Sequence, residues 1–212
     1  GGAVRFVRIQ HDGADWARNV ALKSDLRMLQ EFHSRTNGIP VAARSESIRI
    51  TDIPKYNEAT SPPFIYMTGR KPFSISPEEA RILRDYLLNR GGFLIGDSPG
   101  EYFSSSFKGA VSRALGSKAR WVDIPNDDIL YNFNARLPSG APPLWHHDGS
   151  RAKGIKHNGR WIVFFHPGDM GDAWKNGHSG ADSESVDMAY NMGVNLIHYS
   201  IRQYVQFHKG KF

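Results

Sequence analysis

Apolar positions along the chain form short runs that alternate with segments of helical spacing. Residues 4–9 alternate apolar and basic side chains with a period of two, which predicts a strand with one less-buried face. Continuous apolar runs at 64–68, 93–96 and 161–165 end at glycine or polar residues. Such runs are typical of parallel strands that are buried on both faces. Shorter strands are predicted at 47–50 and at 121–122.

Helical spacing of apolar residues follows most of these runs. We predict helices at about 24–36, with Ser24 as N-cap, and at 76–89, 103–115 and 185–207. The second helix has the clearest start, because Ser76 can cap it, Pro77 suits its first position and Glu79 completes a capping box. Strands that alternate with helices predict an α/β fold, with a mostly parallel sheet and helices on both faces.

We expect one α/β domain over residues 3–208. The stretch at about 125–159 contains Pro138, Pro142 and Pro143 and little regular periodicity, so it predicts a loop-rich elaboration of that domain. With 212 residues, the chain is long enough to form one sizeable core.

Composition excludes some functions. The chain has no cysteine, which rules out disulfides, thiolate zinc sites and a cysteine nucleophile. The net charge of +6 comes from scattered basic residues, a pattern typical of a solvated face that argues against nucleic-acid binding. The absence of an apolar run of membrane-spanning length predicts no membrane span in this chain. The start Gly1-Gly2-Ala3 lacks a methionine, and we expect a targeting segment to have been removed before it.

Residues that follow the predicted strands are candidates for a site, because ligands of open parallel sheets bind at the carboxyl ends of the strands. The candidate ligand-binding residues are His11, Asp12, Asp15, Trp16, Thr68, Gly69, Arg70, Ser98, Asp169 and Trp174. If the strands are parallel, these side chains converge on one edge of the sheet.

Asp97 and His166 are the candidate catalytic residues. Asp97 ends a buried strand, where a carboxylate could act as a general base or could cap the turn at 98–100. His166 also follows a strand and suits acid–base chemistry, although a loop histidine bonded to backbone fits the same position. The neighbouring Ser98 precedes Pro99 and lacks the Gly-x-Ser-x-Gly setting of an exposed nucleophile.

Two further clusters have alternative interpretations. Asp15-Trp16 could place a carboxylate beside an aromatic platform, as sugar-binding sites do, or Trp16 could be buried below its loop. His146-His147-Asp148, together with His157, His166 or His178, has the atoms of a metal site. None of the histidines falls in a His-Glu-x-x-His motif, and we expect no metal and no cofactor.

The block at 68–97 resembles a pattern of class I glutamine-amidotransferase-like proteins, in which a strand, an acidic capping box and a "Tyr-Leu … Gly-Gly" segment lead into the next strand. More narrowly, the chain resembles the bacterial domain-of-unknown-function family 4159. This resemblance depends on Gly13-Ala14-Asp15-Trp16, the block ending in Asp97, Asn158-Gly159-Arg160, and Gly168-Asp169 … Trp174 followed by Gly193-Val194-Asn195.

The resemblance implies a flavodoxin-like sheet and, because family members are often exported or attached to membrane-anchored proteins, a periplasmic or secreted location. It implies no established activity. The family tends to carry a histidine after its fifth strand, where this chain has Asn126-Asp127-Asp128-Ile129, so a role for that histidine does not transfer.

Two functions of different classes follow. The first is a non-catalytic domain that binds a small molecule or an envelope protein, since the amidotransferase nucleophile is missing. The alternative is a hydrolase, metal-assisted or based on Asp and His, acting on a sugar or ester. Nucleic-acid binding is supported by net charge alone.

Overall fold

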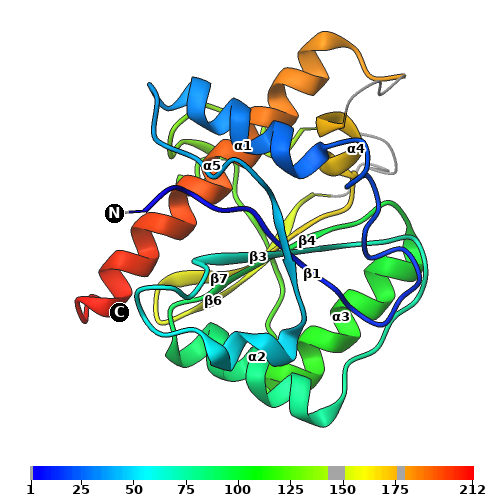
Figure 1. Ribbon diagram of the computed structural model, residues 1–212, viewed down its shortest axis with the longest axis vertical. Helices are drawn as coiled ribbons and strands as arrows, with labels where there is room; N and C mark the ends of the chain where they lie inside the picture. Colours follow the sequence, from blue (N-terminus) through cyan, green and yellow to red (C-terminus); the bar gives the residue numbers. More distant parts are fainter. Residues whose placement is uncertain (1, 143–150, 176–179) are drawn as a thin grey trace.

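A seven-stranded mixed sheet forms the centre of the computed structural model, which describes residues 2–142, 151–175 and 180–212 (Figure 1). Its strand order is β2-β1-β3-β4-β7-β6-β5. The strands are β1 (Val7–Ile9), β2 (Glu46–Ile48), β3 (Phe64–Thr68), β4 (Phe93–Asp97), β5 (Val122–Asp123), β6 (Lys153–His157) and β7 (Arg160–His166). The pairs that join β2, β1, β3, β4 and β7 are parallel, whereas β6 is antiparallel to both of its neighbours. The predicted α/β fold with a mostly parallel sheet is confirmed.

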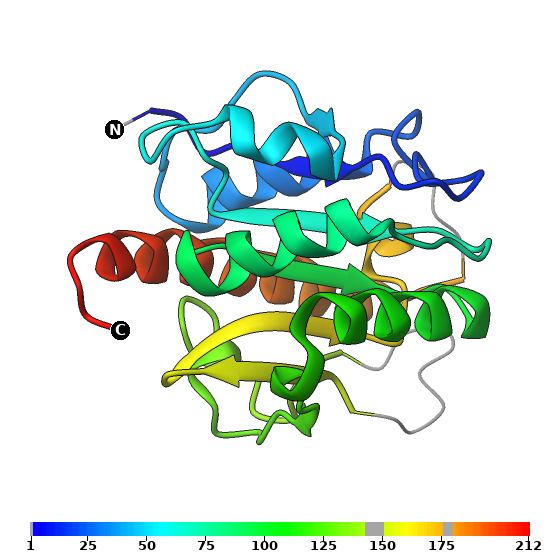
Figure 2. The same cartoon turned by 90° about the horizontal axis from the view of Figure 1, so that it is seen from below.

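Helices cover both faces of this sheet (Figures 1 and 2). One face packs against α2 (Pro77–Asn89) and α3 (Glu101–Leu115), and the other against α1 (Ser24–Arg35), α4 (Met170–Trp174) and α5 (Ser183–His208). Short 3-10 helices are η1 (Ile50–Lys55), η2 (Gly116–Lys118) and η3 (Ile129–Tyr131). Each face therefore has its own apolar cluster, and the sheet lies between the two. None of the helices in the described residues is long and apolar enough to cross a membrane.

Local chemistry explains where two of the helices begin. At α2, the Ser76 side chain accepts from the Glu79 N–H and the Glu79 carboxylate accepts from the Ser76 N–H, which confirms the predicted capping box. The predicted cap of α1 is wrong. Ser24 is the first residue of that helix, and the capping position is held by Lys23 in the left-handed region (φ 63°) without a side-chain cap. The Ser24 hydroxyl instead donates to Asp25 at 3.0 Å.

Two sequence predictions about strands need correction. The loop-rich stretch contains strand β6, which pairs with β7 through a turn at Asn158 and Gly159, both with positive φ. Asn-Gly is a strong hairpin pattern, so the sequence did contain the information for this strand. In β1 neither face is less buried: Arg8 is 1 % exposed because its guanidinium pairs with the buried Asp25.

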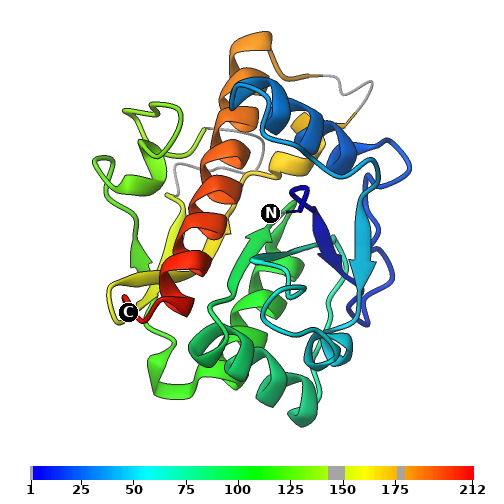
Figure 3. The same cartoon turned by 60° about the vertical axis from the view of Figure 1, so that its left-hand side comes forward.

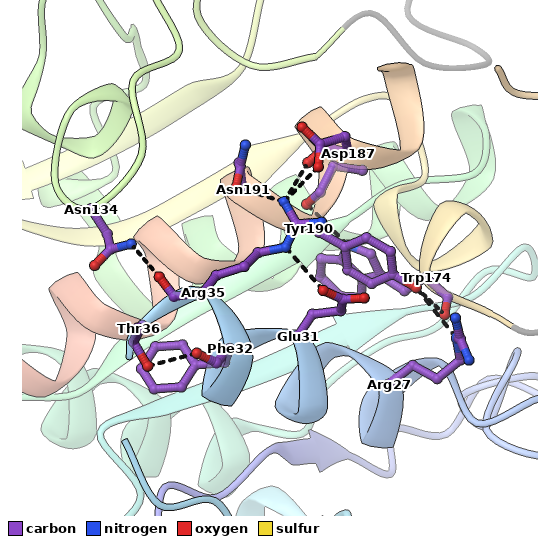
Figure 4. A network of polar contacts seen from close by, with 11 residues as sticks. Arg27, Glu31, Phe32, Arg35, Thr36, Asn134, Trp174, Asp187, Tyr190 and Asn191 are labelled. Atoms are coloured by element: carbon purple, nitrogen blue, oxygen red, sulfur yellow. Dashed lines mark hydrogen bonds and ion pairs between the residues drawn. The ribbon is translucent and has the colours of Figure 1, made fainter. Parts of the chain in front are cut away.

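The helices on the α1 face are tied to one another by polar contacts at their surface (Figure 4). Arg35 of α1 binds Glu31 on its own helix and reaches Asp187 and Asn191 of α5 at 2.7 and 2.8 Å. Further along α5, the Tyr190 hydroxyl donates to the carbonyl of Trp174, the last residue of α4. Figure 3 shows α5 crossing this face beside α1 and α4. The Tyr190 contact holds the end of α4 against α5, and the Arg35 contacts hold α5 against α1.

Candidate functional site

Strands β1 and β3 lie side by side, and the loops that follow them bind each other at the carboxyl edge of the sheet. The His11 ring and the Thr68 carbonyl are 2.7 Å apart. The Asp15 carboxylate accepts from the backbone N–H groups of Arg70 and Lys71 at 2.6 and 3.2 Å. The structure thus brings these predicted site residues together, and it uses their polar atoms to join two loops.

The neighbouring predicted residues have similar roles. Asp12 accepts from both the N–H and the hydroxyl of Ser74. Burial lowers the pKa of His11, and its Nδ1 accepts from the Gly13 N–H at 3.0 Å, so the neutral ring is favoured. Gly69 has φ 151°, and a Cβ there would stand 2.9 Å from the Asp15 carboxylate, which explains why glycine occupies this position.

Asp97 is fully buried and accepts three hydrogen bonds. Its carboxylate accepts from the Tyr66 hydroxyl at 2.5 Å and from the N–H groups of Met170 and Gly171, each at 2.7 Å. The carboxylate does not cap the turn at 98–100, the alternative that its sequence position suggests, but caps α4, which is distant in sequence. Burial raises the pKa of Asp97 to about 7, the nearby charge of Asp169 adds to the rise, and the three hydrogen bonds oppose it.

The Asp97 carboxylate is one end of a buried polar chain that joins four elements, β4, β3, β1 and α1. The Tyr66 ring lies 4.9 Å from the guanidinium of Arg8, a cation–π contact. Arg8 in turn forms a two-pronged ion pair with Asp25 at 2.7 and 2.9 Å. Its remaining contact is with the Trp16 carbonyl at 2.9 Å. Sequence reasoning missed Arg8, Asp25 and Tyr66, which lie within elements and not at strand ends.

Asp169 precedes α4 in the left-handed conformation (φ 58°) and is 3 % exposed. One carboxylate oxygen binds Arg18 at 2.7 Å. The other oxygen and the Arg18 Nε are buried without a hydrogen-bond partner among the described residues. Burial raises the pKa of Asp169, while the Arg18 charge opposes the rise.

His166 is also fully buried and pairs across the strands with Asp97 in the β4–β7 register. Its Nδ1 accepts from the Gly168 N–H at 2.9 Å, and its Nε2 lies 3.2 Å from the Pro142 carbonyl. Both ring nitrogens therefore have backbone partners, the arrangement that the sequence analysis weighed against acid–base chemistry.

The two candidate tryptophans lie in different surroundings. Trp174 is buried in the core, where its ring is 5.8 Å from that of Tyr66 and its indole N–H donates to Ala189. Trp16 is half-buried, and its backbone carbonyl accepts from Arg8. Neither residue lies with Ser98 at the cavity described next, so the structure does not bring the whole predicted set to one place.

A cavity of about 680 Å³ opens at the carboxyl ends of β4 and β7. The chain leaves β4 toward α3 on one face of the sheet and leaves β7 toward α4 on the other, and such a divergence is where open α/β sheets place ligands. The cavity is lined by Ser98, Pro99, Gly100, Glu101, Ser104, Lys108, Arg151, Lys153, Phe165 and Pro167. Of these residues, Ser98 alone belongs to the predicted site.

The cavity lining combines cations, hydroxyls and an aromatic ring. The Ser98 hydroxyl donates to the Gly100 carbonyl at 2.8 Å and lies 2.6 Å from the Ser104 hydroxyl. The Lys108 ammonium stands 5.2 Å from the centre of the Phe165 ring. Lys108 comes from α3, whereas Arg151 and Lys153 come from the segment that enters β6. No sequence pattern links these cations, because only the pairing of β6 with β7 brings them near α3.

Within residues 2–142, 151–175 and 180–212, no group of three or more His, Asp or Glu side chains is placed to hold a metal ion. The alternative metal cluster of the sequence analysis, His146-His147-Asp148, and its possible partner His178 lie outside the described residues.

Comparison with known proteins gives a family and no activity. No curated protein matches the chain. The family model described as "Domain of unknown function (DUF4159)" matches residues 5–201, which is nearly the entire chain. The chain therefore belongs to the DUF4159 family.

Proposed function

We propose that this domain is a non-catalytic binding module whose ligand is a small organic anion held in the cavity between the ends of β4 and β7. The observation that carries the proposal is the lining of that cavity, in which three cationic side chains face one carboxylate, Glu101. Cavities of this size accommodate small-molecule ligands in other proteins.

The three cations come from two segments, α3 and the segment that enters β6, and their shared sign favours a negatively charged ligand. Lys153 is partly neutralised by Asp123 at 2.6 Å, and Arg151 donates to the neutral side chain of Asn126. Lys108 has the Phe165 ring as its neighbour, and a cation–π contact leaves the ammonium charge in place. A phosphate or carboxylate would gain charge-assisted hydrogen bonds from such groups.

Helix α3 adds to the positive potential at the same place. The helix has 15 residues and begins at Glu101, and its capping residue Gly100 has no side chain with which to satisfy the first N–H groups. Those groups and the helix dipole favour an anion. Phe165 and Pro167 supply an apolar wall, which fits a ligand with an organic body, such as a sugar phosphate or a sugar acid.

A hydrolase remains the alternative, and the observation that favours it is the pKa of Asp97, about 7, which suits a general acid or base. Against it, the Asp97 carboxylate already accepts from Tyr66, Met170 and Gly171 and does not line the cavity. Binding without turnover is therefore the better-supported function.

The proposal includes an origin and a location. The strand order β2-β1-β3-β4-β7 follows the flavodoxin-like arrangement 2-1-3-4-5 when β7 takes the fifth place, which supports a glutamine-amidotransferase-like ancestry in which the nucleophile is absent. We place the module in the bacterial periplasm or outside the cell, with a small molecule as its ligand. Cell fractionation that recovers the protein only from the cytoplasm would contradict this location.

The binding proposal is tested by isothermal titration calorimetry of the purified domain with inorganic phosphate, glucose 6-phosphate and glucose. We expect the two phosphates to bind and neutral glucose to give no heat. Lys108→Gln should weaken the phosphate affinity about tenfold, since it removes one hydrogen bond to a charged group. Lys209→Gln removes the same charge from the exposed end of α5 and should leave the affinity unchanged.

Three outcomes would reject the proposal. The first is that neither phosphate binds. The second is an equal loss of affinity in the Lys108 and Lys209 variants, because the effect would then come from net charge alone. The third is hydrolysis of nitrophenyl esters or glycosides that disappears in Asp97→Asn, because this result would establish the hydrolase.

A further inference from the structure

Helices α2 and α3 lie side by side over one face of the sheet (Figure 2). A second hollow lies between them. Its volume is about 500 Å³, and it is lined by Pro77, Ala80, Arg81, Arg84, Arg113 and Ala114. We call it the arginine groove. Its floor is formed by the two buried alanines, and its three charged residues are all arginine.

Backbone carbonyls hold two of these arginines in place. The Arg84 Nη1 donates to the carbonyls of Ala114 and Leu115, at the end of α3, at 3.3 and 3.1 Å. The Arg113 Nη1 donates to the Ile75 carbonyl at 3.2 Å. These bonds use one nitrogen of each guanidinium, and a guanidinium carries five N–H donors in a fixed fork. When a partner binds the remaining donors, these two arginines therefore lose less side-chain entropy than freely moving arginines would.

The positive charge of the arginine groove reaches a neighbouring histidine. The pKa of His157 is lowered, first by its partial burial and then by the charges of Lys118, Arg160 and Arg84. The carboxylates on α2 are Glu78 and Asp85, both exposed, and Glu79, which accepts from the Ser76 N–H in the capping box. None of these three carboxylates lines the arginine groove. An anionic partner would therefore meet three guanidinium groups without having to displace an ion pair between residues that line the groove.

We propose that the arginine groove is a docking surface for an acidic segment of a partner protein. Carboxylates match the two-pronged geometry of arginine, and the alanine floor leaves room for the peptide between them. A peptide is favoured over nucleic acid because the groove lining contains no aromatic ring on which a base could stack. This surface is separate from the cavity at β4 and β7, so ligand binding and partner docking can be tested independently.

The test is fluorescence anisotropy of the whole domain with a fluorescein-labelled peptide of Glu-Ala repeats, at low and at physiological salt. The double variant Arg81→Gln/Arg113→Gln removes two cations from the arginine groove and keeps Arg84, which binds the end of α3. The matched control Arg44→Gln/Arg202→Gln removes two exposed arginines elsewhere, Arg202 being on α5. We expect the groove variant to weaken peptide affinity about tenfold or more and the control to bind as the unmodified domain does.

Arg81→Gln alone is the second variant, because Arg81 is exposed and the change leaves the carbonyl contacts of Arg84 and Arg113 intact. It should weaken peptide binding in the same direction while thermal unfolding stays unchanged. The proposal is overturned if the peptide does not bind at low salt, or if the control weakens binding as much as the groove variant. It is also overturned if an unlabelled DNA duplex displaces the labelled peptide at a lower concentration than the unlabelled peptide does, because nucleic acid would then be the preferred ligand.

Discussion

Tyr66 on β3 donates its hydroxyl to the carboxylate of Asp97 on the adjacent strand β4, at 2.5 Å and out of contact with solvent. The same carboxylate caps α4, so this one pair connects the sheet to a short helix that is distant in sequence. Buried carboxylates are tolerated only when hydrogen bonds compensate for lost hydration. The Tyr66 hydroxyl is therefore expected to have a measurable effect on stability.

Removing this donor tests that expectation. We expect Tyr66→Phe to lower the free energy of unfolding by about 1–3 kcal/mol, because a buried acceptor loses a partner while the ring packing is kept. Urea unfolding followed by tryptophan fluorescence measures the change. The control is Tyr102→Phe, which alters a tyrosine that is 71 % exposed on α3 and should have no effect. Equal stability of the two variants would contradict the role given to the Tyr66 bond.

The pKa of Asp97 predicts how stability changes with pH. Burial, and then the charge of Asp169, raise its folded pKa to about 7, whereas an unfolded aspartate titrates near 4. Between these values the folded state binds a proton that the unfolded state has lost. The contribution of Asp97 to stability is therefore full below pH 4 and is lost as pH rises toward 7. Asp169, whose pKa is also raised, acts in the same direction, and His11, whose pKa is lowered, acts in the opposite one.

A comparison of variants isolates the Asp97 contribution. Asp97→Asn should be less stable overall, since the amide cannot accept all three bonds. Its stability should nevertheless fall less between pH 4.5 and 7 than that of the unmodified domain, and these limits lie at roughly the unfolded and folded pKa values of Asp97. Asp127→Asn changes an exposed aspartate and should keep the original pH dependence. An unaltered pH slope in Asp97→Asn would show that its folded pKa is not raised.

The ion pairs of Arg5, just before β1, and of Arg8, within it, differ in burial and should differ in their contribution to stability. Asp25→Asn leaves the Arg8 guanidinium buried without its opposite charge, and we expect the free energy of unfolding to fall by about 3–5 kcal/mol. Glu46→Gln breaks the Arg5 pair, whose side chains are 26 % and 36 % exposed, and should cost at most about 1 kcal/mol. Chemical denaturation of both variants decides the point; similar losses would contradict the structural role of the Arg8 pair.

Close packing of β4 against α3 gives a further prediction. A Cβ at Gly96 would stand 2.4 Å from the Phe107 ring, so Gly96→Ala should destabilise the fold by about 1–3 kcal/mol and disturb the cavity wall. Gly109→Ala places the same methyl group on α3, where it would meet no atom within 4 Å outside the adjoining helix backbone, and should stabilise the helix by roughly 0.5–1 kcal/mol. Thermal unfolding should show opposite signs for the two changes. Destabilisation by both would indicate an effect of alanine other than the Phe107 clash.

The sequence by itself determined the elements whose pattern is local. Strand β3 and the start of α2 occur at the predicted residues, because a continuous apolar run and a Ser-Pro-Glu-Glu capping box act within a few positions. Strand β6 was missed although Asn158-Gly159 is a local hairpin pattern, since its residues lack a clear alternation. The polar residues at the strand ends could be identified because each directly follows an apolar run that the sequence shows locally.

Only the tertiary structure decided what those polar residues do. The partners of Asp97 lie 31, 73 and 74 positions away, and nothing near Asp97 in the sequence indicates that its carboxylate caps α4. The meeting of Lys108 with Lys153 at one cavity depends likewise on the antiparallel pairing of β6 with β7. Strand and helix formation follow from the period of neighbouring side chains, whereas a site depends on contacts between segments whose separation in the chain carries no periodic pattern.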